Sequence, residues 1–398
     1  MSPTKLYATA VRGTGDLVAG ELEAMGLTGA RWDSGGCRFT TDDPLAAGMR
    51  VCLGLRAGLR VLWPLAAFPA TDADMLYQGA LAVAWEEFLA PKTTFAVHAR
   101  SGAAPPLAYA PFLAQRVKDA IVDRMRDRAG VRPSVDRRDP DVLAYVHVTE
   151  AGQAMVGLDF AGRSLHERGY RTEAGVAPLR ETLAAAMVLA SGWKAERPLL
   201  DPLCGAGTIV LEAALHALAI APGLLRSSFG FQRWPMYGDA AKATWRALLD
   251  EARSRVRPGV GFAITGRDRD PEVLAAARAN LARCPAEVAR AVTFELGDAR
   301  EVAPQVPPAT ILSNPPYGER LGGEGAPVFL RIFGQRLRTL DGHVAFLLAP
   351  AAGQAALGMR ATWERKLMNG PLPVTLARYE LGRAAPGARP APRPRRSR

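Results

Sequence analysis

Apolar and polar residues alternate along the second half of the chain in two different periods. From about residue 161, short apolar runs of strand length are separated by stretches with apolar residues every three or four positions. The runs PLLDPL, FAITGRD, AVTFEL, ATILSN and HVAFLLA predict five strands. The stretches PLRETLAAAMVLASG, TIVLEAALHALAI and DPEVLAAARANLARC predict helices. Strands alternating with helices indicate an α/β fold, in which a parallel sheet carries helices on both sides.

The first 160 residues show a different, mixed order of elements. KLYATAV and CRFTT predict strands, and DLVAGELEAMGL between them predicts a helix, so residues 1–60 form a small α+β unit. A second unit, residues 61–157, contains the predicted strands TFAVHAR, DVLAYVHVT and AMVGLDF. Its predicted helix, PFLAQRVKDAIVDRMRDRAG, has apolar residues at helical spacing and basic residues on its other faces.

The length and the composition favour several folded domains and a disordered end. A chain of 398 residues with 48% hydrophobic residues contains two or three packed domains. We expect the third to span residues 158–383 and the Pro/Arg-rich residues 384–398 to be disordered. The stretch from Leu225 to Pro258, rich in Trp and Arg, is an insertion to which the pattern assigns no role.

The charge favours a polyanionic partner. The formal net charge is +11, and five arginines lie in the tail, so about +6 remains on the folded body. Lysine and arginine release the counterions condensed on phosphates, and this makes RNA a natural partner. We expect RNA contacts from basic residues of the second unit, of the segment after it and of the loop near residue 320: Arg116, Lys118, Arg124, Arg137, Arg138, Arg168, Arg171 and Arg320. A solvated helix face is the alternative interpretation.

Several classes of protein are disfavoured. The four cysteines are far apart and contain no CxxC pair, so neither a disulfide scaffold nor a zinc site is expected, and no metal is predicted. The N-terminus lacks the layout of a secretion signal, and no uncharged apolar run reaches the ~18 residues of a membrane span. We therefore expect a cytoplasmic protein without a membrane partner, and a monomer is slightly favoured over an oligomer.

Three features predict a nucleotide site at the ends of successive strands. In DPLCGAGT, Gly205 and Gly207 allow a tight turn against a ligand before the helix that starts near Thr208. Asp268 ends the second strand, where a carboxylate can accept both hydroxyl hydrogens of a ribose, whereas Asp270 is placed to cap the next helix. Asp298 follows the third strand and can accept a hydrogen bond from an exocyclic amine. Together they predict an adenosine-bearing ligand across the carboxyl edge of the sheet.

The stretch SNPPYGERL follows the fourth strand and faces the same edge. The Asn314 side-chain oxygen and the Pro315 carbonyl can accept two hydrogen bonds from a planar amine, and this stabilises positive charge on its nitrogen as it attacks. Pro315 and Pro316 narrow the backbone's choices, and Tyr317 offers a face on which a base can stack. A plain Pro-Pro-Tyr-Gly turn is the alternative.

Taken in order, DPLCGAGT, TGRDRD, GDAR and SNPPYGERL resemble the motifs of class I S-adenosylmethionine-dependent N-methyltransferases. FAVHAR, RVKDAIVDRMRD, SVDRRDPD, LHERGYR and APLRETLAAAMVLASGW resemble the large-subunit ribosomal RNA guanine-N2 methyltransferases that carry an N-terminal THUMP domain. The resemblance extends from about Leu6 to Leu381. It implies a ferredoxin-like unit, a THUMP RNA-binding domain and a Rossmann-like catalytic domain, with S-adenosyl-L-methionine as methyl donor and guanine N2 of 23S rRNA, naked or in a precursor particle, as acceptor.

The resemblance also implies roles for single residues. Asp268 would hold the ribose and Asp298 the adenine. The target base would be held by Asn314, Pro315, Pro316 and Tyr317. The methionine part of the donor would contact Asp201, Cys204, Gly205, Gly207 and Thr208, beside a helix that begins at Pro178, Glu181 and Thr182.

Some members of that family continue into a second methyltransferase domain, whereas this sequence ends in a basic tail, so we expect any second activity to reside elsewhere. THUMP-containing tRNA guanine-N2 methyltransferases are the nearest alternative. DNA adenine-N6 and release-factor glutamine methyltransferases use the same Asn-Pro-Pro-Tyr motif with other N-terminal regions. A non-catalytic RNA-binding assembly factor is the alternative of a different class.

Overall fold

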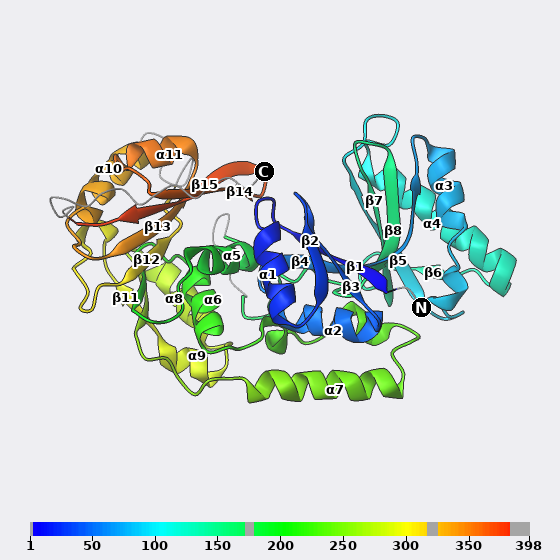
Figure 1. Cartoon of the computed structure of the whole chain (residues 1–398), viewed down its shortest axis with the longest axis horizontal. Coiled ribbons are helices and arrows are strands. Elements are labelled where there is room, and N and C mark those ends of the chain that lie inside the picture. Colours follow the sequence, from blue (N-terminus) through cyan, green and yellow to red (C-terminus); the bar gives the residue numbers. More distant parts are fainter. Residues whose placement is uncertain (1–2, 172–178, 317–324, 383–398) are drawn as a thin grey trace.

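The computed structural model describes residues 3–171, 179–316 and 325–382. In this part of the chain two β-sheets form the centres of two bodies, which lie side by side in Figure 1. The first body comprises the N-terminal 160 residues, and the second comprises the alternating strands and helices that follow. The α/β fold class with a preceding α+β part is confirmed.

One eight-stranded sheet runs through the whole N-terminal body in the order β2-β3-β1-β4-β8-β7-β5-β6. The long strand β4 (Gly58–Pro69) pairs with β1 on one side and with β8 on the other. The predicted boundary between residues 60 and 61 falls inside β4, so the first two predicted units share one sheet. The other strands are β1 (Thr4–Ala10), β2 (Thr28–Trp32), β3 (Gly36–Thr41), β5 (Thr94–Ser101), β6 (Ser134–Val135), β7 (Val142–Val148) and β8 (Gln153–Asp159).

Helices cover this sheet with the apolar faces that their sequences predict. The helix predicted from residue 111 is α4 (Ala110–Ala129), which buries Val117, Ile121 and Met125 and ends at Gly130 in a left-handed conformation. The remaining helices of this body are α1 (Gly15–Ala24), α2 (Pro44–Gly54), α3 (Ala73–Leu81) and the short η1 (Trp85–Glu87).

The second body contains a seven-stranded sheet in the order β11-β10-β9-β12-β13-β15-β14. The five predicted strands are β9 (Leu199–Asp201), β10 (Ile264–Asp268), β11 (Val292–Leu296), β12 (Thr310–Ser313) and β13 (Val344–Ala349), and they run parallel to their neighbours in this set. The sequence pattern missed β14 (Trp363–Asn369) and β15 (Leu372–Glu380), which join antiparallel at the edge.

Both faces of this sheet are buried. Leu199 and Leu312 belong to the apolar cluster on one face, whereas their neighbours Leu200 and Ile311 belong to the cluster on the other face. This follows because successive residues of a strand point to opposite faces of the sheet. The covering helices are α5 (Glu181–Ser191), α6 (Thr208–Ala217), α8 (Pro271–Leu281), α9 (Ala286–Ala291), α10 (Gly325–Leu337) and α11 (Ala351–Ala356). Asp270 caps α8 through the Glu272 and Val273 amides, as predicted.

The insertion of residues 225–258 joins the two bodies. It contains η3 (Gly230–Arg233) and the long helix α7 (Asp239–Ser254), which lies along the bottom of Figure 1, and it follows η2 (Pro222–Leu225). Its side chains Phe231, Trp234 and Trp245 are buried in the apolar cluster of the N-terminal body. The Trp234 ring lies 4.7 Å from that of Phe160 (centroid to centroid), directly after β8. The insertion therefore fixes the N-terminal body against the second body.

Candidate active site

Several predicted site residues lie at the carboxyl ends of neighbouring strands in the second sheet, at the point where the strand order reverses. Asp201 and Asp268 are the last residues of β9 and β10, and Asn314 follows the last residue of β12. Strand β9 lies between β10 and β12, so the strand order reverses at this point. In open α/β sheets the crevice beyond the carboxyl ends at such a reversal is where ligands bind.

Asp201 connects two of these strand ends. Its carboxylate accepts a hydrogen bond from the Ser313 hydroxyl at 2.6 Å and another from the Leu203 amide at 3.1 Å. The residue is buried, and burial raises its pKa to about 7, while the Ser313 hydrogen bond acts in the opposite direction. The bond between Asp201 and Ser313 places Asn314, the next residue along the chain, beside the glycine loop.

The glycine loop turns against β10. The Gly205 amide donates to the Asp268 carboxylate at 3.0 Å, which joins the loop to a third strand end. Gly207 has φ of +82°, and a Cβ atom built there would lie 2.6 Å from the Phe294 ring. Only glycine fits this turn, which leads directly into α6 at Thr208. Cys204 is buried, and burial raises the pKa of its thiol.

Around Gly205 the structure leaves room for a ligand. A Cβ atom built on Gly205 would meet no described atom within 4 Å. Asp268, which accepts the hydrogen bond from the Gly205 amide, is half-buried, and the backbone N–H groups at the start of α6 have no partner within the helix. These features fit a nucleoside-bearing ligand of the kind that the sequence predicts.

Asp298 lies next to Asp268, because the Gly297 amide donates to the Asp268 carbonyl at 2.9 Å. The Asp298 carboxylate already accepts two hydrogen bonds from the Arg300 guanidinium, at 3.0 Å from Nε and 2.6 Å from Nη2. The Arg300 guanidinium holds the pKa of Asp298 below its usual range. A ligand amine that uses this carboxylate has to share it with Arg300.

Asn314 follows β12 and presents a buried hydrogen-bond acceptor. Its side-chain oxygen is buried and makes no hydrogen bond within the part of the chain that the structure describes. Pro315 is buried and Pro316 is half-buried beside it. Because buried oxygens are almost always hydrogen-bonded, this oxygen is a candidate acceptor for an N–H group of a ligand. Tyr317, Arg320 and Pro178, three predicted contacts, lie outside the described residues.

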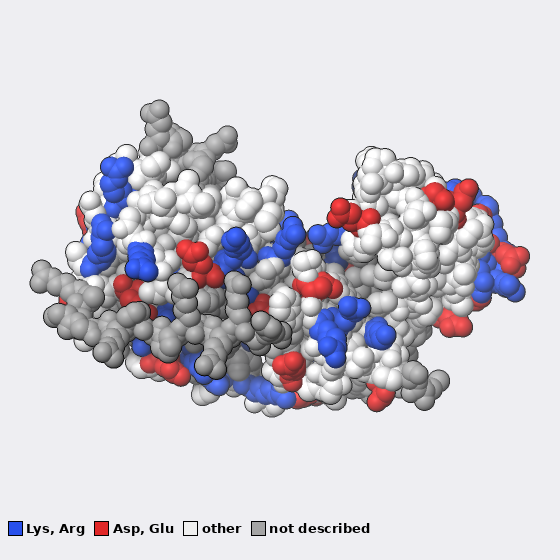
Figure 2. All heavy atoms as spheres, turned by 45° about the horizontal axis from the view of Figure 1, so that its top comes forward, with Lys and Arg blue, Asp and Glu red and all other residues white. Residues whose placement is uncertain are grey.

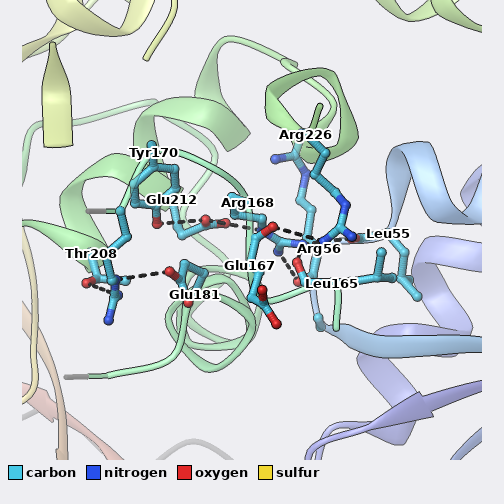
Figure 3. A network of polar contacts seen from close by, with 12 residues as sticks. Leu55, Arg56, Leu165, Glu167, Arg168, Tyr170, Glu181, Thr208, Glu212 and Arg226 are labelled. Carbon is cyan, nitrogen blue, oxygen red and sulfur yellow. Dashed lines mark hydrogen bonds and ion pairs between the residues drawn. The ribbon is translucent and has the colours of Figure 1, made fainter. Parts of the chain in front are cut away.

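The start of α5 contributes a second polar group near the loop (Figure 3). Glu181 is buried and forms an ion pair with Arg171 at 3.0 Å, and burial raises its pKa to about 6. Arg171 also donates to the Thr208 hydroxyl at 2.7 Å, so it ties α5 to the glycine loop. The Thr182 hydroxyl is buried and makes no hydrogen bond to any described residue.

One of the predicted RNA contacts is an interior residue, and the expectation for it is wrong. Arg168 is 1% exposed, and its guanidinium donates to Glu212 and to the carbonyls of Leu55, Arg56 and Leu165 (Figure 3). Arg171 is half-buried, and its contacts with Glu181 and Thr208 lie within the second body, so its contact with RNA remains a prediction. Because the guanidinium donors of Arg168 are used inside the protein, Arg168 instead stabilises the junction between the bodies.

The predicted contacts of the N-terminal body lie nearer the surface. Arg137 and Arg138 are exposed, whereas Arg116 pairs with Asp74, Lys118 with Asp119 and Arg124 with Glu86. Figure 2 shows basic and acidic side chains interspersed over the visible face, with several Lys and Arg side chains at the saddle between the two bodies. Their contact with RNA remains a prediction.

Sequence reasoning missed two residues that shape the site. Ser313 holds Asp201, and Phe294 on β11 packs against the glycine turn. Ser313 stands within the motif that was recognised, but a lone serine gives no signal before its partner is known.

Among the described residues no group of three or more His, Cys, Asp or Glu side chains could hold a metal ion, and none of the helices is long and apolar enough to cross a membrane.

Three family models match successive parts of the chain. Residues 5–62 match a model described as the RlmL ferredoxin-like domain, and residues 70–159 match the THUMP domain. Residues 168–378, more than half of the chain, match a model described as RMKL-like, methyltransferase domain. The resemblance seen in the sequence is confirmed for all three parts.

Known proteins are similar over nearly the whole length. "Putative RNA methyltransferase slr0064" of Synechocystis sp. is 36% identical over 381 residues, which cover 94% of this chain and 96% of that protein. SMU.472 is named as a methyltransferase, and its crystal structure contains S-adenosylhomocysteine. The two structures superpose with a TM-score of 0.84 at 29% sequence identity, over 97% of this chain and 100% of the SMU.472 chain. A Listeria monocytogenes protein named as a predicted N6-adenine-specific DNA methylase has a TM-score of 0.81 and 29% identity, over 96% of this chain and 97% of its own.

The methyl donor of such enzymes is S-adenosylmethionine, and the residues predicted to bind it lie at the ends of β9, β10 and β12. With a ferredoxin-like part, a THUMP domain and a donor-binding sheet in this order, the chain belongs to the THUMP-containing, RMKL-like family of S-adenosylmethionine-dependent RNA methyltransferases.

Proposed function

We propose that this protein transfers a methyl group from S-adenosylmethionine to the exocyclic N2 amine of a guanine in 23S rRNA. The observation that carries the proposal is the buried side-chain oxygen of Asn314, which has no hydrogen-bond partner among the described residues, next to the Ser313–Asp201 hydrogen bond. An amine of a flat base, held by this oxygen, would supply the missing hydrogen bond.

The chain's own residues would act mainly by positioning. The donor, when bound, supplies a methyl group on a sulfonium, which is already a good electrophile. Asn314 would orient the amine and stabilise the positive charge that develops on its nitrogen. Ser313 would keep Asn314 in register with the glycine loop through its 2.6 Å bond to Asp201. The proton can leave the nitrogen after transfer, since the methylated amine is then cationic and acidic.

The choice of substrate rests on the N-terminal body. An orphaned oxygen suits adenine N6 as well as guanine N2, and the Listeria relative is named for adenine in DNA. A THUMP domain and a relative named as an RNA methyltransferase favour RNA for this chain. The resemblance of the first 160 residues and of SNPPYGERL to ribosomal RNA guanine-N2 methyltransferases favours 23S rRNA over tRNA.

Mass mapping of RNA from cells that lack the protein tests this proposal. We expect one N2-methylguanosine to disappear from 23S rRNA and to return when the purified protein and S-adenosylmethionine are added to that RNA. If the methyl group is lost from tRNA and not from 23S rRNA, the substrate is tRNA. Donor binding without transfer to naked or partly assembled ribosomal RNA would identify an assembly factor instead.

A further inference from the structure

A basic cavity of about 530 Å³ lies where the two bodies join. Its walls come from the segment after β8, from the start of α5 and from the loop before η3. Five arginines line it, against two glutamates. They are Arg163, Arg168, Arg171, Arg180 and Arg226.

Two of these positive charges have no carboxylate partner among residues 3–171, 179–316 and 325–382. Arg163 pairs with Glu167 at 2.9 Å, Arg168 with Glu212 at 3.4 Å and Arg171 with Glu181 at 3.0 Å. Arg226 donates only to backbone carbonyls of residues 161–167, and Arg180 makes no ion pair within the described part of the chain. The described lining residues therefore carry an excess of positive charge.

The walls of this cavity are held in place before any ligand arrives. Arg226 binds the carbonyls of Ser164 and Glu167 at 2.8 and 2.9 Å, and it reaches two further carbonyls of the same segment. The buried Arg168 fixes the segment from the other side (Figure 3). An anion that enters the cavity does not have to order these residues, so little conformational entropy is lost on binding.

The cavity adjoins the donor site. Arg171 and Glu181 line the cavity, and Arg171 also contacts Thr208 at the end of the glycine loop. Arg180 is exposed, and its side chain is free of any hydrogen bond to the described residues. Guanidinium groups suit phosphate because their fork of N–H donors matches two phosphate oxygens.

We propose that this cavity binds a backbone phosphate of the RNA strand beside the target nucleotide, with Arg180 as the mobile contact and Arg226 as a fixed source of positive field. The inference rests on the proposed function only in taking RNA as the substrate. It gives the strand a path from the N-terminal body to the crevice at the end of β12, across the junction that Figure 3 shows.

Variants at Arg180 test the inference. RNA affinity should be measured for Arg180→Gln over a range of KCl concentrations, with an unmodified 23S rRNA transcript and a tRNA transcript as probes. Loss of one phosphate contact should weaken binding several-fold and reduce the slope of log K against log[KCl] by about 0.7. Arg180→Lys keeps the charge and should keep most of the slope.

Two further variants control this experiment. Arg246→Gln removes an equal charge from an exposed position of α7, outside the cavity, and should leave the slope unchanged. Ser227→Glu places a carboxylate on the exposed rim of the cavity and should weaken RNA binding without removing any contact of the fold. Affinity for S-adenosylhomocysteine should stay the same in all variants.

If Arg180→Gln and Arg246→Gln bind RNA alike, the inference is overturned, and absence of salt-dependent RNA binding by the wild type would also overturn it. The proposed function fails separately, when the wild type binds 23S rRNA but transfers no methyl group to it. In that case the slopes of log K against log[KCl] for the wild type and the variants still show whether the cavity binds a phosphate.

Discussion

At the scale of single residues, Asn314 and Asp201 are polar groups whose burial has to be compensated. Asp201 receives two hydrogen bonds from the protein, whereas the Asn314 side-chain oxygen receives none from the described residues. An unsatisfied buried oxygen costs roughly 1–3 kcal/mol. Proteins keep such a group where a ligand satisfies it, so Asn314 is the residue on which we expect turnover to depend.

Replacing Asn314 by Ala should lower the methylation rate at saturating donor by roughly 100-fold, the effect of removing one positioned group that stabilises developing charge. Binding of S-adenosylhomocysteine, measured by calorimetry, should change less than about 3-fold. A normal rate on 23S rRNA in the Ala variant would show that the amine is held elsewhere.

The buried carboxyl of Asp201 should make stability depend on pH. Its pKa is about 7 in the folded protein and 3.8 in an exposed aspartate, so between these values the folded state holds one proton more than the unfolded state. Stability therefore falls as pH rises from 4 to 7, by on the order of 3 kcal/mol. Urea unfolding without donor should show this fall in the wild type relative to Asp201→Asn. Parallel pH profiles of the two proteins would contradict it.

At the scale of elements, the site depends on how β9, the glycine loop and α6 are connected. Gly207 lies between the loop and the helix in a left-handed conformation, and Phe294 on β11 fills the space where a side chain would stand. A strand, a turn and a helix thus meet within a few residues. The backbone conformation of this turn places the first amides of α6 and the Gly205 amide beside the crevice.

Gly207→Ala should lower the free energy of unfolding by roughly 1–3 kcal/mol and weaken donor binding, because φ of +82° and the Phe294 ring both disfavour a side chain. Gly20→Ala is a matched control on α1, where an added methyl group meets no described atom within 4 Å. It should raise stability by about 0.5–1 kcal/mol, as expected for Gly to Ala within a helix. Equal effects of both changes in denaturant unfolding would argue against the strain at Gly207.

At the scale of the whole molecule, the N-terminal body and the catalytic body behave as one folded unit. Phe160 stacks with Trp63 of β4 and lies against Trp234 of the insertion, so a residue of the second body completes the apolar core of the first. A second contact between the bodies is polar: Arg365 of β14 donates two hydrogen bonds to the Asp16 carboxylate of α1, at 2.6 and 2.7 Å. RNA bound by the N-terminal body would therefore be held at a fixed distance from the crevice.

Trp234→Ala should lower the free energy of unfolding by roughly 3–5 kcal/mol, since it removes a buried aromatic side chain from the shared core. Trp32→Ala is the matched control, because Trp32 is 62% exposed and should change stability by less than about 0.5 kcal/mol. Protease digestion should also cut the Trp234 variant between its two bodies sooner than the wild type. If both variants unfold alike, the insertion does not join the bodies.

The local pattern of residues determined much of this protein. Hydrophobic periodicity predicted the five parallel strands and, of the described helices that cover them, α5, α6 and α8. Asp270 before Pro271 predicted a helix cap that the structure contains. Asp201, Asp268 and Asn314 were recognised as neighbours because the ends of parallel strands share one edge of a sheet. Each strand and each cap is encoded by residues close together in the sequence, and the rule for parallel sheets then brings the distant strand ends to one edge.

Other features were decided only by contacts between distant segments. β15 pairs antiparallel with β13 and adds β14 as the edge strand of the sheet. The aromatic residues of the insertion are buried only because the N-terminal core lies beside them. Arg168 looked like an RNA contact, yet Glu212, 44 residues away, and three carbonyls bury it. The charge of a side chain can be read from the sequence, but its exposure depends on what the fold packs around it.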